Sequence, residues 1–339
     1  MENTKKKMSL NDFLLNYSLY IVLGALILVV IIMEPSFISL QNITNILGQA
    51  STRIIMALGA AGLIILKGTD LSAGRILGLT AVVASSLAQS TSYASRMYPN
   101  LPALPLILPL LAAIAVGMMF GAINGFGVAK LKVHAFIITL GTQLIAYGLS
   151  LIYIDRPPNG AQPIGSLDVR YTDLVRNTVD IGPVQLPYVI FYAAIISVIM
   201  WFVWNKTKLG KNMYAIGGNT EAAEVSGVNI VKNIMIIFVI SGLLYGIAGF
   251  LEAARIGSTT SNTGLNYDLD AISASVIGGV SFSGGVGTIP GVIMGAVILQ
   301  FINYGLTFVG VSPYLQYIIK GLIIILAVSI DVRKYIVKK

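Results

Sequence analysis

The chain is predicted to be an all-α integral membrane protein, on the basis of its composition and the arrangement of its apolar residues. Of the 339 residues, 56% are hydrophobic and 11% are charged, whereas about a quarter of the residues of a soluble domain carry charge. The mean hydropathy is +0.83. The apolar residues form long runs that lack the strict alternation of a β-barrel strand, so helices are expected.

A helix needs roughly 20 apolar residues to cross a hydrocarbon core of about 30 Å. On this basis we expect about ten transmembrane helices, in a single transmembrane domain that covers residues 1–339. The eighth run is short and ends among glycines, so it is tilted, broken or a half-span. The ten runs are 15–33, 43–66, 71–90, 104–128, 133–154, 185–204, 233–254, 268–283, 287–309 and 313–331.

The positions of lysine and arginine predict the orientation. With a cytoplasmic tail at 1–14 and ten spans, most of the 22 basic residues face the cytoplasm, and only Arg53 and Lys320 fall inside spans. This bias follows the positive-inside rule and puts both termini in the cytoplasm. The first run follows three lysines and lacks a small-residue cleavage site, so we expect a retained anchor.

The large outer loop, 155–184, divides the predicted spans into five before it and five after it. The two halves then have opposite orientations, as in transporters whose pathway lies between inverted repeats. The sequence support for an inverted repeat is one short similarity, between TDLSA at 69–73 and YDLDA at 267–271.

Glycine recurs at every fourth residue on three of the predicted spans. This spacing puts the glycines on one helix face, where another backbone can approach closely. The neighbour is either another helix of this chain or a helix of a second copy. The glycines are Gly117, Gly121 and Gly125, then Gly242 and Gly246, and then Gly287, Gly291 and Gly295.

The cytoplasmic loop 205–232 is expected to contain a short helix. A turn at 217–219 leads into it, Asn219 or Thr220 caps its N-terminus before Glu221, and residues 226–227 end it. Such an element is either a docking site for a soluble partner or a plain linker. Its residues are Gly217, Gly218, Asn219, Glu221, Ala222, Ala223, Ser226 and Gly227.

Ionisable side chains inside a bilayer cost roughly 3 kcal/mol or more each, so each one is a candidate functional residue. Glu252 and Arg255 are three residues apart near the outer end of the seventh span, where they can form an ion pair. That pair is either structural or part of a pathway. Arg53 lies well inside the second span, so we expect it to face the protein interior or a water-filled cavity.

The remaining acidic candidates are placed near the membrane boundaries. Asp70 is expected to cap the third span at the cytoplasmic surface, beside Arg75, and Asp268 and Asp270 take the equivalent place at the outer start of the eighth span. Several neutral polar residues also lie within or near spans. They either line a path for a polyhydroxylated solute or form hydrogen bonds between helices. They are Gln143, Asn303, Tyr304, Gln316 and Tyr317.

Several functional classes are not supported by the sequence. There is no cysteine, and His134 is the only histidine, so a thiolate site is excluded and a lone histidine cannot hold a metal. The nearest fragment to a P-loop, residues 210–212, lacks the required pattern, and no catalytic motif occurs, so we expect no bound cofactor and no enzyme. The net charge of +8 fits loops beside anionic lipid and needs no nucleic-acid partner.

Segments spread over residues 15–335 resemble the inner-membrane permeases of bacterial ABC sugar importers of the ribose/galactose branch, and are most similar to its galactoside members. These segments are GTDLSAGR at 68–75, FIITLGT at 136–142, YAIGGN at 214–219, EAA at 221–223, SGVN at 226–229, EAAR at 252–255, LDAI at 269–272, GGVSFSGGVGT at 278–288 and INYGLT at 302–307.

The resemblance implies a permease homodimer in the bacterial cytoplasmic membrane. It also implies a cytoplasmic ABC ATPase that binds ATP and Mg²⁺, and an extracytoplasmic sugar-binding protein that delivers galactose or a methyl galactoside. In such importers a cytoplasmic loop helix sits in a cleft of the ATPase. Residues 221–227 match the first half of the EAA-x3-G coupling pattern, but residues 229–232 lack its second half.

Two other functions are considered beside an ATP-driven permease. An ion-coupled secondary sugar transporter needs a titratable or ion-coordinating group near the membrane midplane, together with broken helices. In the predicted topology only Arg53 is deep, and every acidic residue lies near an interface. A membrane scaffold without transport would fit the docking loop but leaves the outer loop 155–184 without a role.

Overall fold

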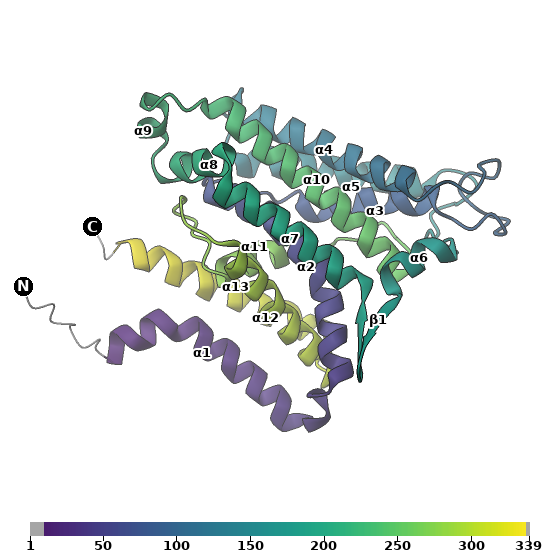
Figure 1. The fold of residues 1–339 in the computed structure, drawn as a ribbon, viewed down its shortest axis with the longest axis horizontal. Coiled ribbons are helices and arrows are strands. Elements are labelled where there is room, and N and C mark those ends of the chain that lie inside the picture. The colour runs from purple at the N-terminus through teal and green to yellow at the C-terminus, as the bar shows by residue number, and fades with distance from the viewer. Residues whose placement is uncertain (1–9, 337–339) are drawn as a thin grey trace, which may run out of the picture.

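The computed structural model describes residues 10–336 as a bundle of helices with one small hairpin (Figure 1). The prediction of an all-α integral membrane protein is confirmed. The elements are α1 (Leu10–Met33), a 3-10 turn (Pro35–Phe37), α2 (Leu40–Ile65), α3 (Ala73–Leu87), α4 (Ile107–Ala129), α5 (Ala135–Asp155), α6 (Val169–Arg176), β1 (Thr178–Ile181), β2 (Val184–Pro187), α7 (Tyr188–Lys206), α8 (Lys208–Gly218), α9 (Thr220–Val225), α10 (Ile230–Ile256), α11 (Tyr267–Ile277), α12 (Ile289–Phe308) and α13 (Pro313–Ile336).

Six helices among the described residues are long and apolar enough to cross a bilayer, namely α2, α4, α5, α7, α10 and α12. Helix α3 and the apolar stretches found in α1 and α13 are shorter. The count of ten spans therefore stays a prediction. The predicted tail at 1–14 lies partly outside the described residues, because α1 begins at Leu10.

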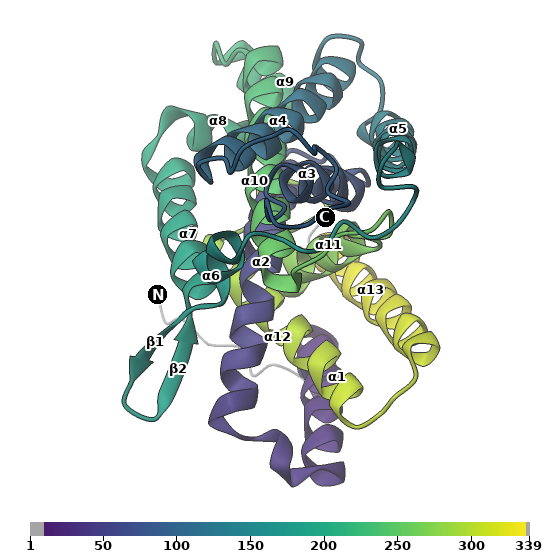
Figure 2. The same cartoon turned by 90° about the vertical axis from the view of Figure 1, so that its right-hand side faces the viewer.

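Helices α2 and α10 form the centre of the bundle. They have the most buried apolar windows of the six long helices, whereas only 28–33% of the windows of α4, α5 and α7 is buried. Figure 2 shows α2 and α10 in the middle, with α5 and α7 on opposite sides. An apolar surface of this extent on the outer helices is the surface that a bilayer covers.

Glycines let α4 lie directly against α10. A Cβ on Gly117 would lie 2.1 Å from the carbonyl oxygen of Gly242, and one on Gly121 would lie 2.4 Å from that of Phe238. A Cβ on Gly295 of α12 would likewise meet α11. These close approaches are within one chain, as one of the two alternatives predicted. The extension of the third glycine run to Gly287 is wrong, since α12 begins only at Ile289.

Helices α3 and α11 are short and lie inside the bundle. Helix α11 has 11 residues, which at 1.5 Å per residue gives roughly 17 Å, far less than a bilayer. The chain before it, 257–266, runs back along α3, because a Cβ on Gly78 would lie 2.1 Å from the carbonyl oxygen of Thr263. The predicted eighth run, 268–283, is therefore not one continuous helix. A run of turns, 261–266, precedes the helix, and the helix ends at Ile277.

The outer loop 155–184 is ordered into secondary structure. It holds α6 and β1, and β1 pairs antiparallel with β2 in the register Thr178↔Pro187. Asp168 caps α6 by accepting a hydrogen bond from the backbone N–H of Arg170. Hydrogen bonds from the Arg170 side chain hold the pKa of the Asp168 carboxyl below its usual value. Because β2 ends at Pro187, α7 begins at Tyr188, later than the predicted start at 185.

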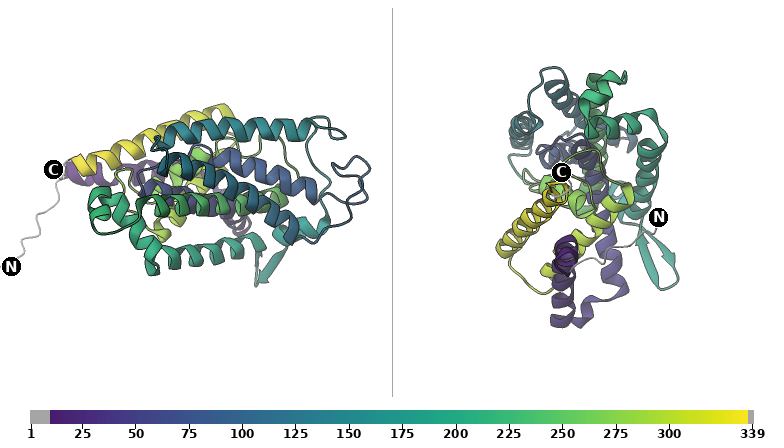
Figure 3. Two further views of the ribbon diagram at one scale, coloured as in Figure 1. Left: turned by 90° about the horizontal axis from the view of Figure 1, so that it is seen from above. Right: turned by 90° about the vertical axis from the view of Figure 1, so that its left-hand side faces the viewer.

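The two ends of the bundle differ in charge. Helices α8 and α9 lie at one end, with α6 and the hairpin at the other (Figure 1). Lysines gather at the α8–α9 end, where Lys67 Nζ lies 3.4 Å from the carbonyl oxygen of Gly218. The positive-inside rule predicts that this end faces the cytoplasm. Helix α1 begins and α13 ends on that same side (Figure 3).

Candidate functional site

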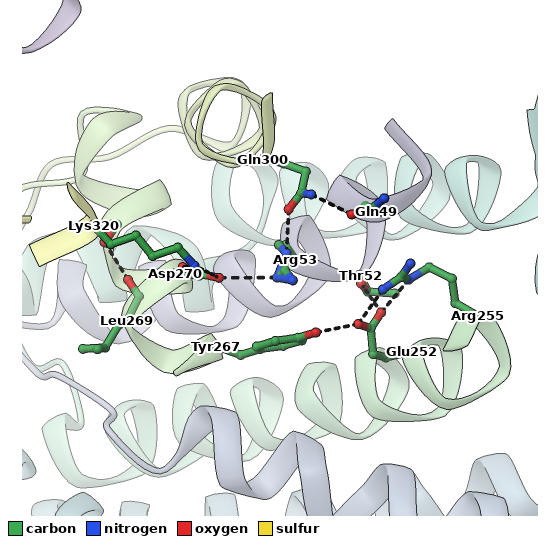
Figure 4. A network of polar contacts seen from close by, with 11 residues as sticks. Gln49, Thr52, Arg53, Glu252, Arg255, Tyr267, Leu269, Asp270, Gln300 and Lys320 are labelled. Atoms are coloured by element: carbon green, nitrogen blue, oxygen red, sulfur yellow. Dashed lines mark hydrogen bonds and ion pairs between the residues drawn. The ribbon is translucent and has the colours of Figure 1, made fainter. Parts of the chain in front are cut away.

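A network of charged and polar side chains lies inside the bundle, centred on Arg53 of α2 (Figure 4). The Arg53 Nε–H donates a hydrogen bond to Gln300 Oε1 of α12 at 2.7 Å. Its Nη1 lies 3.4 Å from Asp270 Oδ2 of α11, and its guanidinium lies 4.2 Å from the centre of the Tyr267 ring. The expectation that Arg53 faces the interior is confirmed.

Asp270 joins three helices. Besides Arg53, it accepts a hydrogen bond from Lys320 Nζ of α13, 3.0 Å from Asp270 Oδ1. Its own side chain is only 7% exposed. A carboxylate held between two cations offsets the large cost of removing these charges from water. Asp270 and Lys320 are 50 residues apart, so no local spacing in the sequence indicates their pairing.

Glu252 is the most deeply buried charge of the network, with 0% exposure. It accepts hydrogen bonds from Nε and Nη2 of Arg255, each at 2.8 Å, so the predicted pair is confirmed and is bidentate. Thr52 Oγ1 and the Tyr267 hydroxyl also donate to it, both at 2.8 Å. The carboxylate is therefore satisfied by three different helices, α2, α10 and α11.

Tyr267 connects the two halves of the network. Its ring faces the Arg53 guanidinium, while its hydroxyl binds Glu252 (Figure 4). Since three cations and two carboxylates meet here, the network as a whole carries one excess positive charge. Gln49 extends it along α2 by accepting a hydrogen bond from Gln300 Nε2 at 2.9 Å.

The expectation that every acidic residue lies near an interface stays a prediction, because burial inside the bundle does not fix the depth of a residue in a membrane. Asp70, Glu252, Asp268 and Asp270 are all buried. Asp70 lies just before α3, Asp268 and Asp270 lie in the first turn of α11, and Glu252 lies in the last part of α10. This placement was hidden from the sequence, since only the fold of 257–266 shows where α11 starts.

Asp70 does not cap α3. The N-cap position is taken by Ser72, which makes no side-chain capping bond. Asp70 Oδ1 instead accepts hydrogen bonds from the Ser72 N–H, at 2.9 Å, and from the Ser72 hydroxyl. Asn124 of α4 donates to Ser72 Oγ at 2.9 Å, and Thr142 of α5 donates to Asn124 Oδ1 at 2.7 Å. Asp70 thus anchors the start of α3 to its neighbours.

The two acidic residues of α11 do not cap it either. Asn266, in the left-handed conformation with φ of 62°, holds the N-cap position and forms no side-chain capping bond. Asp268 and Asp270 follow inside the first turn, where the positive end of the helix dipole favours carboxylates.

The neutral candidates lie outside the Arg53 network. The Tyr304 hydroxyl donates to Asn42 Oδ1 at 3.0 Å, so for Tyr304 the interhelical alternative holds. Asn303 has a buried Oδ1 without a partner among the described residues. Gln143 is half-buried on α5, and no described residue forms a hydrogen bond with it. Gln316 donates to the carbonyl oxygen of Val311, and Tyr317 is exposed.

The loop 205–232 folds into α8 and α9. Asn219 Oδ1 accepts a hydrogen bond from the N–H of Ala222 at 2.9 Å, so the predicted cap of the short helix is confirmed. Ser226 is its C-cap, and Gly227 follows with φ of 82°, as expected. The predicted turn at 217–219 is wrong, since α8 runs through Gly218.

A close backbone contact explains the glycine at position 217. A Cβ there would lie 1.8 Å from the carbonyl oxygen of Ile65, the last residue of α2. The Gly285 N–H donates to that same carbonyl at 2.9 Å. The Tyr214 hydroxyl donates to the carbonyl oxygen of Gly287 at 2.9 Å. Helix α8 is thus seated on the end of α2 and on the connection between α11 and α12.

Helix α9 projects from α8 and is largely uncovered. Ala223 is its one buried residue, while Glu221 and Ala222 are exposed and Val225 is 90% exposed. Figure 1 shows α9 at the outermost corner of the α8–α9 end. A rigid base and an exposed capped helix form a surface suited to contact with another protein.

Known proteins match the chain over nearly its full length. A family model described as "Branched-chain amino acid transport system / permease component" matches residues 42–328. The galactose/methyl galactoside import permease protein MglC of Escherichia coli K12 is 50% identical over 98% of each chain. MglC of Haemophilus influenzae is 48% identical over 97% of each chain.

A ribose permease is more distantly similar. The ribose import permease protein RbsC of E. coli K12 is 38% identical, over 93% of this chain and 92% of its own. No solved structure matches the chain. Because the family model covers most of the sequence and the full-length relatives share up to half of it, this chain belongs to the branched-chain amino acid transport system / permease component family.

Proposed function

We propose that this chain is the permease subunit of an ABC importer that carries galactose or a methyl galactoside across the bacterial cytoplasmic membrane. The similarity to the MglC permeases supports the sugar class. The chain lacks a P-loop of its own, so a separate cytoplasmic ATPase supplies the energy. An extracytoplasmic binding protein delivers the sugar, and a second copy of the permease completes the pathway.

The observation that carries this proposal is the way α8 and α9 join the bundle. Helix α9 is exposed for contact with the ATPase, and α8 rests on Ile65, Gly285 and Gly287. Ile65 ends the helix that carries Arg53, and residues 278–288 connect the helices that carry Asp270 and Gln300. A movement of α9 is therefore transmitted to both sides of the buried network.

The network is suited to hold one of two packing arrangements. Its ion pairs join α2, α11 and α13, and α11 is a short helix with a run of turns before it. Such a helix can shift while its hydrogen bonds stay intact. ATP binding and hydrolysis in the partner would then favour one arrangement over the other through different contacts with α9.

Uptake by the reconstituted transporter tests the proposal. The permease, ATPase and binding protein are placed in vesicles, and labelled galactose and methyl galactoside uptake is followed with ATP. We expect that Glu221→Ala with Gly227→Ala abolishes uptake but leaves the permease in the membrane. Wild-type uptake in this double variant, with normal ATPase association, contradicts the coupling role.

A matched control separates coupling from backbone strain. Asp180 and Gly182 lie in the exposed hairpin at the opposite end, and Gly182 also has a positive φ, of 62°. The double change to alanine there also removes one acidic side chain and one positive-φ glycine, but away from α9, and membrane yield and ATPase association are expected to match those of the coupling variant. Sugar accumulation by the permease alone on a proton or sodium gradient overturns the proposal in favour of secondary transport.

A further inference from the structure

A cleft of about 500 Å³ lies between α8 and the start of α10, beside the residues that follow α9. It is separate from the buried network and borders the C-terminal end of α9, since Ser226 and Gly227 line it. Its walls include Lys208 and Asn212 of α8 together with Lys232 and Asn233 of α10. The Asn212 side chain donates a hydrogen bond to Asn233 Oδ1 at 3.2 Å, which ties one wall to the other.

The cleft is electrically positive. No aspartate or glutamate lines it, and neither Lys208 nor Lys232 forms an ion pair with any residue in the described part of the chain. The N-terminus of α10 borders the same cleft. Asn229, its N-cap residue, lines the cleft, and Asn229 Oδ1 accepts a hydrogen bond from the backbone N–H of Lys232. A helix N-terminus adds a partial positive charge to that of the two lysines.

The position of the cleft along the membrane normal matches the headgroup layer of the cytoplasmic leaflet. Helix α7 ends at Lys206, whose Nζ lies 5.6 Å from the centre of the Trp201 ring. A tryptophan beside a lysine at the end of an apolar helix marks the membrane–water interface. Lys208 follows two residues later, so the cleft lies level with lipid phosphates.

The cleft also has an apolar side. Leu209, Val228 and Ile236 line it together with the lysines. A free phosphate would leave these side chains uncovered, whereas the glycerol and upper acyl chain of a lipid would cover them. A second cleft of about 270 Å³, between α4, α6, α7 and α10, is lined by apolar and aromatic residues and offers no cation.

We propose that the α8–α10 cleft binds the phosphodiester headgroup of an anionic phospholipid from the cytoplasmic leaflet. Lys208 and Lys232 contact the phosphate oxygens, and the apolar side chains contact the glycerol and upper acyl chain. The bound lipid contacts both α8 and α10. It thereby stabilises the position of α8, the helix from which α9 projects. Basic pockets between helices on the cytoplasmic side are suited to such headgroups.

Tryptophan fluorescence gives a local measurement of this site. The chain has two tryptophans, Trp201 and Trp204, and both lie at the α7 end near Lys208. The purified full-length permease is placed in phosphatidylcholine nanodiscs with increasing amounts of brominated phosphatidylglycerol, and quenching is recorded. We expect wild-type protein to be quenched at a lower phosphatidylglycerol fraction than random mixing predicts, and unlabelled phosphatidylglycerol to reverse the effect.

Charge-removing variants identify the site. Lys208→Gln with Lys232→Gln is expected to raise the half-quenching fraction by roughly fivefold per lysine, up to the limit set by random mixing. The control, Lys130→Gln with Lys132→Gln, removes the same charge from an exposed loop at the same end and is expected to behave like wild type.

Three results overturn the proposal. The first is equal quenching of the cleft and control variants, and the second is reversal of quenching by inorganic phosphate as effectively as by phosphatidylglycerol. The third is a cleft variant that loses ATPase association while its quenching is unchanged, because the cleft is then a protein contact. The quenching measurement itself uses neither ATPase nor sugar, so a negative quenching result leaves the proposed transport function intact.

Discussion

The Arg53 network and the α8–α9 element differ in whether their charged side chains have partners within the chain. In the network each ion has partners within the chain, as when Glu252 accepts four hydrogen bonds from Arg255, Thr52 and Tyr267. On α9, Glu221 is exposed and forms no ion pair among the described residues. Inside a bilayer an unpaired charge is costly, whereas at the α8–α9 end of the bundle partners can come from water or another protein.

This difference separates stability from coupling. Changes in the network should lower the free energy of unfolding of the permease, while changes on α9 should leave it nearly unchanged and affect transport. The contact between Gly217 and Ile65 joins the two regions mechanically. Thermal unfolding in detergent measures the loss of stability in each variant. Sugar uptake by the α9 variant then measures the loss of transport.

The largest effect is expected from Asp270→Ala. The variant leaves Arg53 and Lys320 without their shared carboxylate inside the bundle, which should lower stability by about 3–5 kcal/mol. Asp180→Ala in the exposed hairpin is the control, and a change within about 0.5 kcal/mol is expected there. Equal unfolding temperatures for the two variants would show that the Asp270 ion pairs contribute nothing.

A double-mutant cycle on Glu252 and Arg255 should give the next largest effect. Arg255→Ala leaves the buried carboxylate with only Thr52 and Tyr267, so a loss near the lower end of about 3–5 kcal/mol is expected. Removing both charges should cost less than the sum of the single changes, with a coupling energy of about 0.5–3 kcal/mol. Additive losses would argue against the pair.

Gly117→Ala tests the close packing of α4 on α10. The added methyl group would lie 2.1 Å from the carbonyl oxygen of Gly242, and such overpacking typically costs about 1–3 kcal/mol. Gly148→Ala on α5 is the matched control, because nothing lies within 4 Å of its Cβ position. That change should be neutral or should stabilise the protein by about 0.5–1 kcal/mol.

The smallest effect on stability is expected from Val225→Asp on α9. The side chain is 90% exposed, so the change should be within about 0.5 kcal/mol. ATP-driven sugar uptake should nevertheless fall strongly, because a charge is placed on the proposed ATPase contact. Val179→Asp in the hairpin is the control for unfolding temperature. Full uptake by the Val225 variant would remove α9 from the coupling surface.

Interactions between residues close in the sequence could be predicted well. Glu252 and Arg255 share one helix face at a separation of three, so their pairing needed no knowledge of the fold. The cap at Asn219 and the end of α9 at Gly227 also follow from local backbone preferences. Arg53 was placed in the interior because a charge facing lipid is too costly.

Partners from distant segments could not be predicted. Thr52 and Tyr267 contact Glu252 from α2 and α11, and no spacing in the sequence indicates either contact. The predicted turn at 217–219 failed because glycines there were interpreted as flexible. Gly217 instead lets α8 approach the carbonyl oxygen of Ile65.

The sequence by itself determined that the protein is helical and embedded in a bilayer, because the lengths of the apolar runs and the positions of the lysines can be read directly from it. It also determined which charges are costly and need partners. Only the tertiary structure decided where α3 and α11 begin, since the segment 257–266 folds back along α3 through contacts between distant glycines and carbonyl groups. That placement brought Asp270 and Tyr267 to Arg53, and so formed the network.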